Sequence, residues 1–315
     1  MFRKLFYNKI VSALKPHHRQ YATVICNCRK KNAKKTLDMK ILISLFLLIS
    51  TILYSQTHRF IYEFKYLQNP NQTELKKENM TLDINTEDTK FYNYHYVTID
   101  STNITKGQNS QLWDSSTPVI VRKKNSNLNS NYTLIDDVFV YETNDNIDWK
   151  LENETKKFEN YILQKATTKF GGRNWTAWFA KEINIAEGPY KFRGLPGLIF
   201  QVYDDKNHFE FTLVKSFKLK PTYKTPFLES FYGQKPIKTT EENINRMLMN
   251  LYNDPYHDTR ERFSKNSNTN TEFNINGVII KNVSQFKELA EIRQKNIREN
   301  NYPIEIEKAL NYSAK

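Results

Sequence analysis

Residues 170–203 read FGGRNWTAWFAKEINIAEGPYKFRGLPGLIFQVY, and this stretch decides the fold. It opens on paired glycines, Gly171 and Gly172, which can take the positive φ that a tight hairpin turn requires. Large and small side chains then alternate, which is the period-two pattern of a half-buried strand. The stretch therefore predicts a long hairpin with arms at 158–168 and 175–183.

A second hairpin is expected directly after the first. Residues 198–203 and 209–214 are apolar or aromatic runs, and the Asp and Asn residues of 204–207 are typical of a turn between them. The two hairpins are joined by a corner that contains Leu195-Pro196-Gly197. Proline followed by glycine predicts a type II turn there.

The pattern of strands continues towards the N-terminus, and helices follow towards the C-terminus. Further strands are expected at 58–67, 91–99, 119–122, 132–141 and 147–151. Apolar residues spaced three and four apart predict a helix over 241–251, capped by Thr240, and a second helix capped by Ser284. This order predicts a mainly β or α+β fold, in which C-terminal helices accompany a large twisted antiparallel sheet with a half-barrel as its curved form.

The net charge of the chain is concentrated at its N-terminal end. The 315 residues carry 47 Lys and Arg against 34 Asp and Glu, a net charge of +13, which suggests a polyanionic partner. Residues 1–38 hold ten of these basic residues, one acid and both cysteines, Cys26 and Cys28. We expect this segment to be a spurious or disordered basic extension; a cytoplasmic basic arm before a short anchor at 41–54 is the alternative.

Residues 39–55 have the layout of a secretory signal peptide. Met39-Lys40 precedes a 13-residue apolar run, and Ser55 supplies the small residue expected at a cleavage site. The run is shorter than the roughly 20 apolar residues that a membrane-spanning helix needs. We therefore expect a periplasmic or secreted protein, not a transmembrane one, with a single β-rich domain over 56–315.

Removal of residues 1–55 changes the expected partner. The remaining 260 positions hold 36 basic and 33 acidic residues, a net charge of +3, and no cysteine. A nearly balanced chain lacks the electrostatic footprint of nucleic-acid binding, so we expect no nucleic-acid partner. A basic nucleic-acid binder remains a lower alternative that requires residues 1–38 to be retained.

Residues 194–199 spell GLPGLI, and the chain resembles the GLPGLI family of bacterial exported proteins. The resemblance covers most of 56–315 and is densest over 145–215. Besides the string itself it is carried by Trp149, Tyr161, Lys165-Ala166, Gly172-Arg173, Trp175, Ala177-Trp178-Phe179, Glu182-Ile183 and Gly188-Pro189-Tyr190-Lys191-Phe192, together with the tyrosines of the opening strand and the late Pro303-Ile304-Glu305. The resemblance implies a periplasmic or secreted protein of a Gram-negative bacterium, and it supplies no enzymatic activity and no catalytic residue.

The motif has two interpretations. In the first it is structural, because glycines and prolines suit a corner between strands. The residues assigned to this structural motif are Gly188, Pro189, Tyr190, Gly194, Leu195, Pro196, Gly197, Leu198 and Ile199. In the second, Arg173, Trp175, Trp178 and Tyr190 line a concave sheet face and contact a ligand or partner, because Trp and Arg are enriched where binding energy concentrates.

Other chemical signals are weak. The sequence has no G-x-S-x-G, H-E-x-x-H or P-loop string. Asp204, Asp205 and His208 lie close together, but acidic residues in a hairpin turn are ordinary turn chemistry. We therefore assign no catalytic residue, metal or cofactor.

These observations favour an exported, non-enzymatic binding or accessory protein. Its ligand is expected to be apolar, or its partner an outer-membrane receptor. The alternative is a hydrolase or metal-dependent enzyme whose site is assembled from residues distant in the sequence.

Overall fold

The computed structural model describes residues 57–220, 224–265, 273–275 and 277–313, all within the unit Ser55–Lys315. The basic extension predicted at 1–38 and the signal peptide predicted at 39–55 lie outside the described residues. Among the described helices, none is long and apolar enough to cross a membrane.

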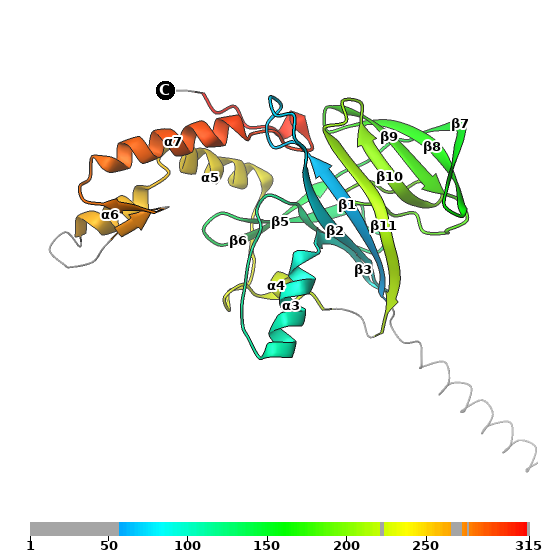
Figure 1. Cartoon of the computed structure of the whole chain (residues 1–315), viewed down its shortest axis with the longest axis horizontal. Coiled ribbons are helices and arrows are strands. Elements are labelled where there is room, and N and C mark those ends of the chain that lie inside the picture. The colour runs from blue at the N-terminus through cyan, green and yellow to red at the C-terminus, as the bar shows by residue number, and fades with distance from the viewer. Residues whose placement is uncertain (1–56, 221–223, 266–272, 276, 314–315) are drawn as a thin grey trace, which may run out of the picture. The chain divides into compact units, whose positions relative to one another are not determined.

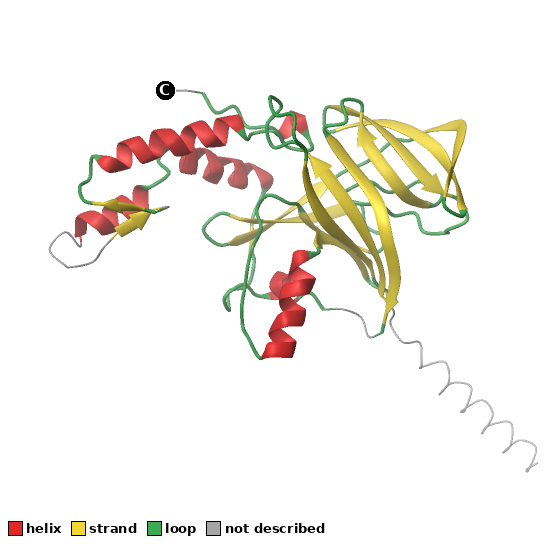
Figure 2. Cartoon of the chain, viewed as in Figure 1, coloured by secondary structure: helices red, strands yellow, loops and turns green. Residues whose placement is uncertain are grey.

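In the described part of the chain, twelve strands form one sheet (Figures 1 and 2). They are β1 (Thr57–Tyr66), β2 (Lys76–Ile84), β3 (Asp88–Asn93), β4 (Val119–Lys123), β5 (Leu128–Leu134), β6 (Val138–Asn144), β7 (Lys150–Phe158), β8 (Tyr161–Phe170), β9 (Arg173–Ala180), β10 (Leu198–Asp204), β11 (Phe209–Leu219) and β12 (Ile237–Lys238). Their order in the sheet is β12-β6-β5-β4-β3-β2-β1-β11-β10-β9-β8-β7. Every neighbouring pair is antiparallel except β12 and β6, so the predicted mainly β fold is confirmed.

The alternating aromatic residues of β1 explain its central position. β1 pairs with β2 on one side and with β11 on the other. Tyr62 and Phe64 are almost completely buried, and the ring of Phe64 stacks on its cross-strand partner Phe211 at 4.2 Å. Period-two burial of large rings therefore fixes the register in the middle of the sheet.

Both predicted hairpins are confirmed. Gly171 and Gly172, with φ of 60° and 77°, make the tight turn between β8 and β9. β10 and β11 form the second hairpin, and Asn207 takes a φ of 55° in its turn. Left-handed backbone at glycine and asparagine is what short hairpin turns require.

The prediction of a type II turn at Leu195-Pro196-Gly197 is wrong. Gly197 donates its N–H to Leu195 O at 2.8 Å, which is the three-residue pattern of a γ-turn. A Cβ at position 197 would lie 2.1 Å from the carbonyl oxygen of Ala180. The glycine is therefore needed because two backbone segments approach closely, and not because of a particular turn type.

Several predicted strands differ from the structure. The strand expected at 147–151 begins only at Lys150 and continues to Phe158 as β7, and the arm expected at 175–183 ends at Ala180. The strand expected at 91–99 ends at Asn93, and helix α3 (His95–Lys106) follows; the Asn93 side chain accepts the N–H of His95 at 2.9 Å. The strand expected at 132–141 is interrupted by a turn in which Ile135 N–H bonds to Asp137 O. That turn separates β5 from β6.

The C-terminal helices are α5 (Glu241–Asn253), α6 (His257–Lys265) and α7 (Gln285–Glu299). Thr240 caps α5 by accepting the N–H of Asn243 at 3.2 Å, as predicted. Ser284 makes no such bond at α7, so that predicted cap is wrong. The Gln285 side chain instead accepts two backbone N–H groups that precede the helix.

Smaller elements complete the chain. A two-stranded hairpin, β13 (Phe273–Ile275) and β14 (Val278–Ile280), lies between α6 and α7 in the sequence. α4 (Pro226–Glu229) precedes β12, and the 3-10 helix η1 (Ile306–Lys308) follows α7. The helical region has its own small cluster of buried side chains, namely Tyr256, Ile280 and Phe286.

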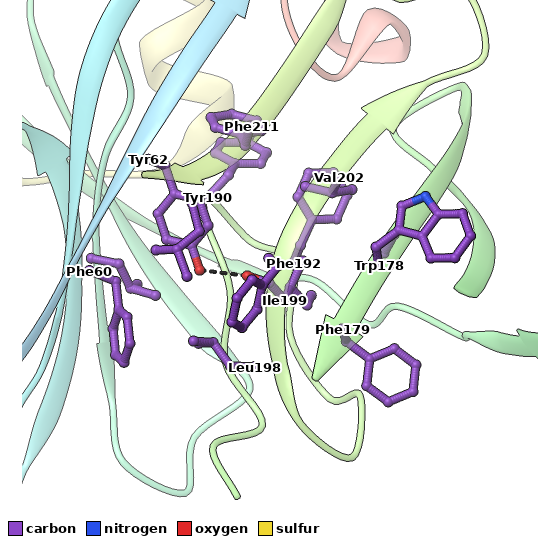
Figure 3. Close-up of a cluster of buried hydrophobic side chains, with 14 of the residues drawn as sticks. Phe60, Tyr62, Trp178, Phe179, Tyr190, Phe192, Leu198, Ile199, Val202 and Phe211 are labelled. Carbon is purple, nitrogen blue, oxygen red and sulfur yellow. Dashed lines mark hydrogen bonds between the residues drawn. The ribbon is translucent and has the colours of Figure 1, made fainter. Parts of the chain in front are cut away.

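The connection between β9 and β10, residues 181–197, packs into the inner face of the sheet. Phe192 is fully buried, with its ring 4.6 Å from Trp175 and 6.4 Å from Phe211. Tyr62 donates its hydroxyl to Ile199 O at 2.6 Å, at the start of β10, as the dashed line in Figure 3 marks. The motif therefore forms part of the core.

Contacts from this connection to distant strands require the sheet to curve. Glu187 pairs with Arg122 of β4, and Arg193 donates to Ser126 O at 2.7 Å, just after that strand. β4 is not a neighbour of β9 or β10 in the sheet. The connection joins β9 to β10 and also contacts β4. It can do so only because the sheet curves around it, as in the curved form that the sequence predicts.

Candidate functional site

A cavity of about 450 Å³ lies on the inner face of the sheet, between the strands, α5 and residues 300–312. Its walls include eight aromatic side chains: Phe64, Tyr66, Tyr132, Tyr141, Tyr190, Phe209, Tyr302 and Tyr312. Four charged side chains also border it: Lys191, Glu241, Glu305 and Lys308. We call this space the inner cavity.

Tyr190 and Lys191, from the corner motif, form one charged end of the inner cavity. Tyr190 has a φ of 56°, an unusual left-handed value for a bulky residue. Lys191 is only 2% exposed, and its ammonium lies 2.6 Å from Glu305 and 3.0 Å from Asp145. Tyr190 donates its hydroxyl to Glu305 as well. The motif therefore presents two donors to one buried carboxylate from the C-terminal part of the chain.

At the charged end of the inner cavity, the surroundings of Tyr190 and Tyr141 keep both phenols protonated. Burial raises the pKa of Tyr190 well above its ordinary value, and the nearby Glu305 raises it further. Burial, with Glu241 beside it, raises the pKa of Tyr141 to about 12. Both phenols are therefore neutral donors at physiological pH.

Asp145 lies at the same charged end. Its burial opposes ionisation, but the Lys191 ammonium and hydrogen bonds from Thr143 and Asn129 outweigh that effect and lower its pKa. Asp145 is therefore a carboxylate, and Lys191 has an anionic partner on two sides.

Arg173 anchors the segment Tyr302–Lys308, which we call the C-terminal clasp. Its guanidinium donates to Ile304 O at 2.8 Å and to Pro303 O at 3.0 Å. It also pairs with Asp204 at 3.2 Å and lies 4.5 Å from the ring centroid of Tyr302. A planar guanidinium with several donors suits this combination of carbonyls, carboxylate and ring.

The turn between β8 and β9 packs tightly against the same clasp. A Cβ on Gly171 would lie 2.7 Å from the Glu305 side chain, and one on Gly172 would lie 2.8 Å from Ile306. The glycines thus serve the turn and the close approach together. At the other end, Lys308 pairs with Glu241 of α5 at 2.8 Å and with Glu305 at 3.2 Å.

The structure brings only some of the predicted contact residues together. Arg173 and Tyr190 meet at the C-terminal clasp. Trp175 is 1% exposed, donates to Phe170 O and packs on Phe192 within the core. Trp178 occupies the other face of β9, where the Lys156 ammonium lies 4.3 Å from its ring centroid. Contact of these four residues with a ligand or partner stays a prediction.

Sequence reasoning missed the acidic partners of the motif. Glu305 is more than 100 residues away from Lys191 in sequence, and nothing local marks it as a buried carboxylate. Two signals were available: Glu305 lies in a short apolar stretch between Ile304 and Ile306, and Pro303-Ile304-Glu305 is part of the resemblance to the GLPGLI family.

Asp204 and His208 lie in the turn between β10 and β11, as expected, but Asp204 is also fully buried and pairs with Arg173. Asp204 accepts the N–H groups of His208 and Phe209, and His208 Nδ1 lies 2.7 Å from the Tyr302 hydroxyl. In the described part of the chain, no group of three or more His, Cys, Asp or Glu is arranged to hold a metal ion.

Comparison with known proteins gives one family match, over a short stretch. A family described as "Protein of unknown function (Porph_ging)" matches residues 171–201. The matched stretch contains the β8–β9 turn, Arg173, the Tyr190-Lys191 pair and the corner motif, so it holds the anchors of the C-terminal clasp. No curated protein matches the chain.

Two solved structures are similar to part of the chain. The first, titled "Structure of PNGF-II in C2 space group", is 15% identical, with a TM-score of 0.44 over 62% of this chain and 33% of that chain. The second, "Structure of PNGF-II in P21 space group", is 16% identical, with a TM-score of 0.43 over 61% and 33%. The match thus spans about a third of those longer chains, and no inference about this chain is drawn from either.

Proposed function

We propose that the chain is an exported, non-enzymatic binding protein that holds a small, largely apolar ligand in the inner cavity. The observation that carries this proposal is a space of about 450 Å³ whose walls include eight aromatic side chains beside polar and charged ones. Its volume lies in the range of roughly 300–1,000 Å³ that is usual for small-molecule pockets in proteins.

The chemistry of the charged end supports an apolar ligand. Lys191 and Lys308 are already paired with carboxylates of the chain itself, and Tyr190 already donates to Glu305. A strongly charged ligand would have to replace these partners, which costs free energy at a buried site. An apolar ligand instead contacts the aromatic walls and leaves the ion pairs intact.

Export is supported by the sequence pattern. Residues 39–55 have the layout of a signal peptide, and the GLPGLI string at 194–199 resembles a family of exported bacterial proteins. We infer a periplasmic or outer-membrane-associated location. An outer-membrane receptor is the partner to which such a protein would deliver or present its ligand.

Binding is tested with the neutral dye phenylnaphthylamine, whose fluorescence rises in apolar surroundings. The unmodified chain is expected to enhance the fluorescence. Leu248→Trp places an indole in the inner cavity and should abolish the enhancement. Leu251→Trp, on the same helix but outside the lining of this cavity, is the matched control and should retain it. Equal enhancement by the chain and by Leu248→Trp contradicts binding in the inner cavity.

Export is tested by intact-mass measurement of the protein from the cells that produce it. The expected species begins at Gln56. A species that begins at Met1 contradicts export through cleavage, and a small molecule retained under native conditions identifies the ligand class.

A further inference from the structure

A second, polar cleft of about 830 Å³ opens beside the C-terminal clasp. It lies between the end of β6, the turn from β8 to β9, and the start of α5, and it shares Glu241, Glu305 and Lys308 with the inner cavity. Its lining residues come from Glu142–Asn146, Lys169–Asn174, Glu241, Glu305, Glu307 and Lys308. We call it the edge cleft, because one wall is the end of an edge strand.

The edge of β6 that faces away from β5 is paired with β12 over only part of its length. β12 pairs with β6 at Phe139 and Val140 alone, and Thr239 then donates its N–H to Val140 O at 2.9 Å. β6 continues to Asn144, and among the described residues no strand pairs with 141–144 on that side.

The free part of this edge exposes backbone groups in the right positions for pairing. Outward and inward backbone groups alternate along an antiparallel strand. Because Val140 O points outward, the N–H and C=O of Glu142 and Asn144 point outward too. Both residues are exposed. An extended chain laid beside them would therefore find two donors and two acceptors.

The edge cleft has an excess of negative charge. It is lined by five acidic side chains, Glu142, Asp145, Glu241, Glu305 and Glu307, against three basic ones, Lys169, Arg173 and Lys308. Arg173 and Lys308 are already committed to Asp204, Glu241 and Glu305. Glu142 and Glu307 are exposed, so their carboxylates can pair with cations brought by a partner.

β7, at the opposite edge of the sheet, is protected against pairing with other chains. β7 carries Lys150, Lys156 and Lys157, and its pairing with β8 is interrupted by a register shift between Leu151 and Thr155. Lysines and bulges are devices by which edge strands avoid pairing with other chains. β6, which reads VFVYETN, has no lysine and no proline.

We propose that the edge cleft binds an extended, basic polypeptide segment, which adds a strand to the free part of β6. The backbone of the partner pairs with Glu142 and Asn144, and its Lys or Arg side chains contact Glu142 and Glu307. Strand addition of this kind draws affinity from main-chain hydrogen bonds and specificity from side-chain contacts. This site is separate from the proposed ligand in the inner cavity.

The proposal is tested on the whole chain with a fluorescein-labelled peptide of alternating Lys and Thr, by fluorescence polarisation at low salt. Because the whole chain has a net charge of +13, general electrostatics oppose the binding of a cationic peptide. The expected result is binding that a matched Glu-Thr peptide does not show. The same Lys-Thr peptide with alternate backbone nitrogens methylated should bind at least about tenfold more weakly, because it cannot pair along the strand.

Variants locate the binding to the edge cleft. Glu142→Lys with Glu307→Lys should weaken the Lys-Thr peptide about tenfold, since two contacts become repulsive. Glu74→Lys with Glu291→Lys makes the same change in net charge at exposed positions outside the cleft and should have a much smaller effect. Asn144→Pro removes one outward N–H without touching the ladder to β5, and should weaken binding while the melting temperature stays unchanged.

Three results would overturn the proposal. One is the absence of Lys-Thr peptide binding. The second is equal weakening by the two double variants, which would place the interaction in the general field of the protein. The third is unchanged affinity of the methylated peptide, which would mean that no strand is added.

Discussion

The motif-bearing part of the sheet and the helical region are held together in different ways. In the first, β8–β11 with the connection 181–197, the fully buried side chains include Phe179, Phe192 and Ile199. In the helical region, 241–299, the separate cluster rests on three buried residues, and α6 buries none. Buried contacts are dense in the first region, whereas the helical region combines a small buried cluster with partly exposed hydrogen bonds such as those of Gln294 and Arg298 to Tyr252.

The difference teaches where substitutions should matter. Residues of the motif are fixed by backbone approach and buried charge, so small changes there should affect the whole sheet. Similar changes in the helical region should have local and smaller effects. Two pairs of substitutions compare the two regions directly, and Asp145→Asn and a pair of helix-cap variants test each region separately.

The largest effect is expected at Gly197. Valine there would place a Cβ 2.1 Å from Ala180 O, so the strands around it cannot keep their positions. We expect a loss of more than about 4 kcal/mol in the free energy of unfolding, measured by urea denaturation. Gly277→Ala in the β13–β14 turn meets no atom within 4 Å, and at a φ of 86° it should cost only about 1–2 kcal/mol. Similar losses of stability for the two variants would contradict the predicted difference between the motif-bearing part of the sheet and the helical region.

The second-largest loss of stability is expected when the buried ammonium of Lys191 is removed. Lys191→Met leaves Asp145 without its cation and leaves Glu305 paired with Lys308 alone, which should lower the free energy of unfolding by about 3–5 kcal/mol. Lys265→Met removes an exposed ion pair with Glu261 on α6, and we expect no measurable change. Thermal and urea unfolding of both variants provide the comparison. A stable Lys191→Met protein would mean that the motif does not hold the clasp through charge.

The pH dependence of stability should report on Asp145. Its pKa is lower in the folded protein than in the unfolded chain, so its stabilisation is full above the ordinary Asp pKa near 4. That stabilisation is lost as the pH falls towards the lowered pKa. Asp145→Asn should therefore be less stable than the unmodified chain at pH 7, by about 1–3 kcal/mol, and the difference should shrink below about pH 4. Urea denaturation across this range measures it, and a constant difference would contradict the role of Lys191.

The smallest losses of stability are expected at the starts of α5 and α7, where the sequence predicts the same kind of helix cap. Thr240→Ala removes the bond to Asn243 N–H and should cost about 1 kcal/mol. Ser284→Ala removes no cap bond at α7 and should be close to neutral. Hydrogen exchange of the first turn of each helix distinguishes the two. Equal loss of protection would show that Ser284 caps α7 in solution.

The sequence predicted the hairpins because their signals are local. Alternating rings in β1 and β9, paired glycines at 171–172 and an Asp-Asn turn before β11 each act within a few residues. It failed at α3, where the run 91–99 alternates like a strand, but the strand ends at Asn93 and a helix begins at His95. It failed at Gly197 as well, because the constraint comes from Ala180 on another segment.

The candidate site was only half visible in the sequence. Arg173 and Tyr190 stand in a recognisable string, and both were singled out. Their partners, Glu305 and the carbonyls of Pro303 and Ile304, lie more than 100 residues away in sequence. The family resemblance includes Pro303-Ile304-Glu305, but no periodicity or spacing pairs positions so distant, so neither the clasp nor the two cavities beside it could be foreseen.

The sequence by itself determined that the chain forms a large antiparallel sheet with helices after it, since strand and helix periods are properties of neighbouring residues. Only the tertiary structure decided what residues 170–203 are for. In the chain they look like two hairpins and a corner; in the fold they fill the inner face of the sheet and hold the C-terminal clasp. The physical reason is that burial, ion pairing and close backbone approach depend on segments that meet only when the sheet has curved around them.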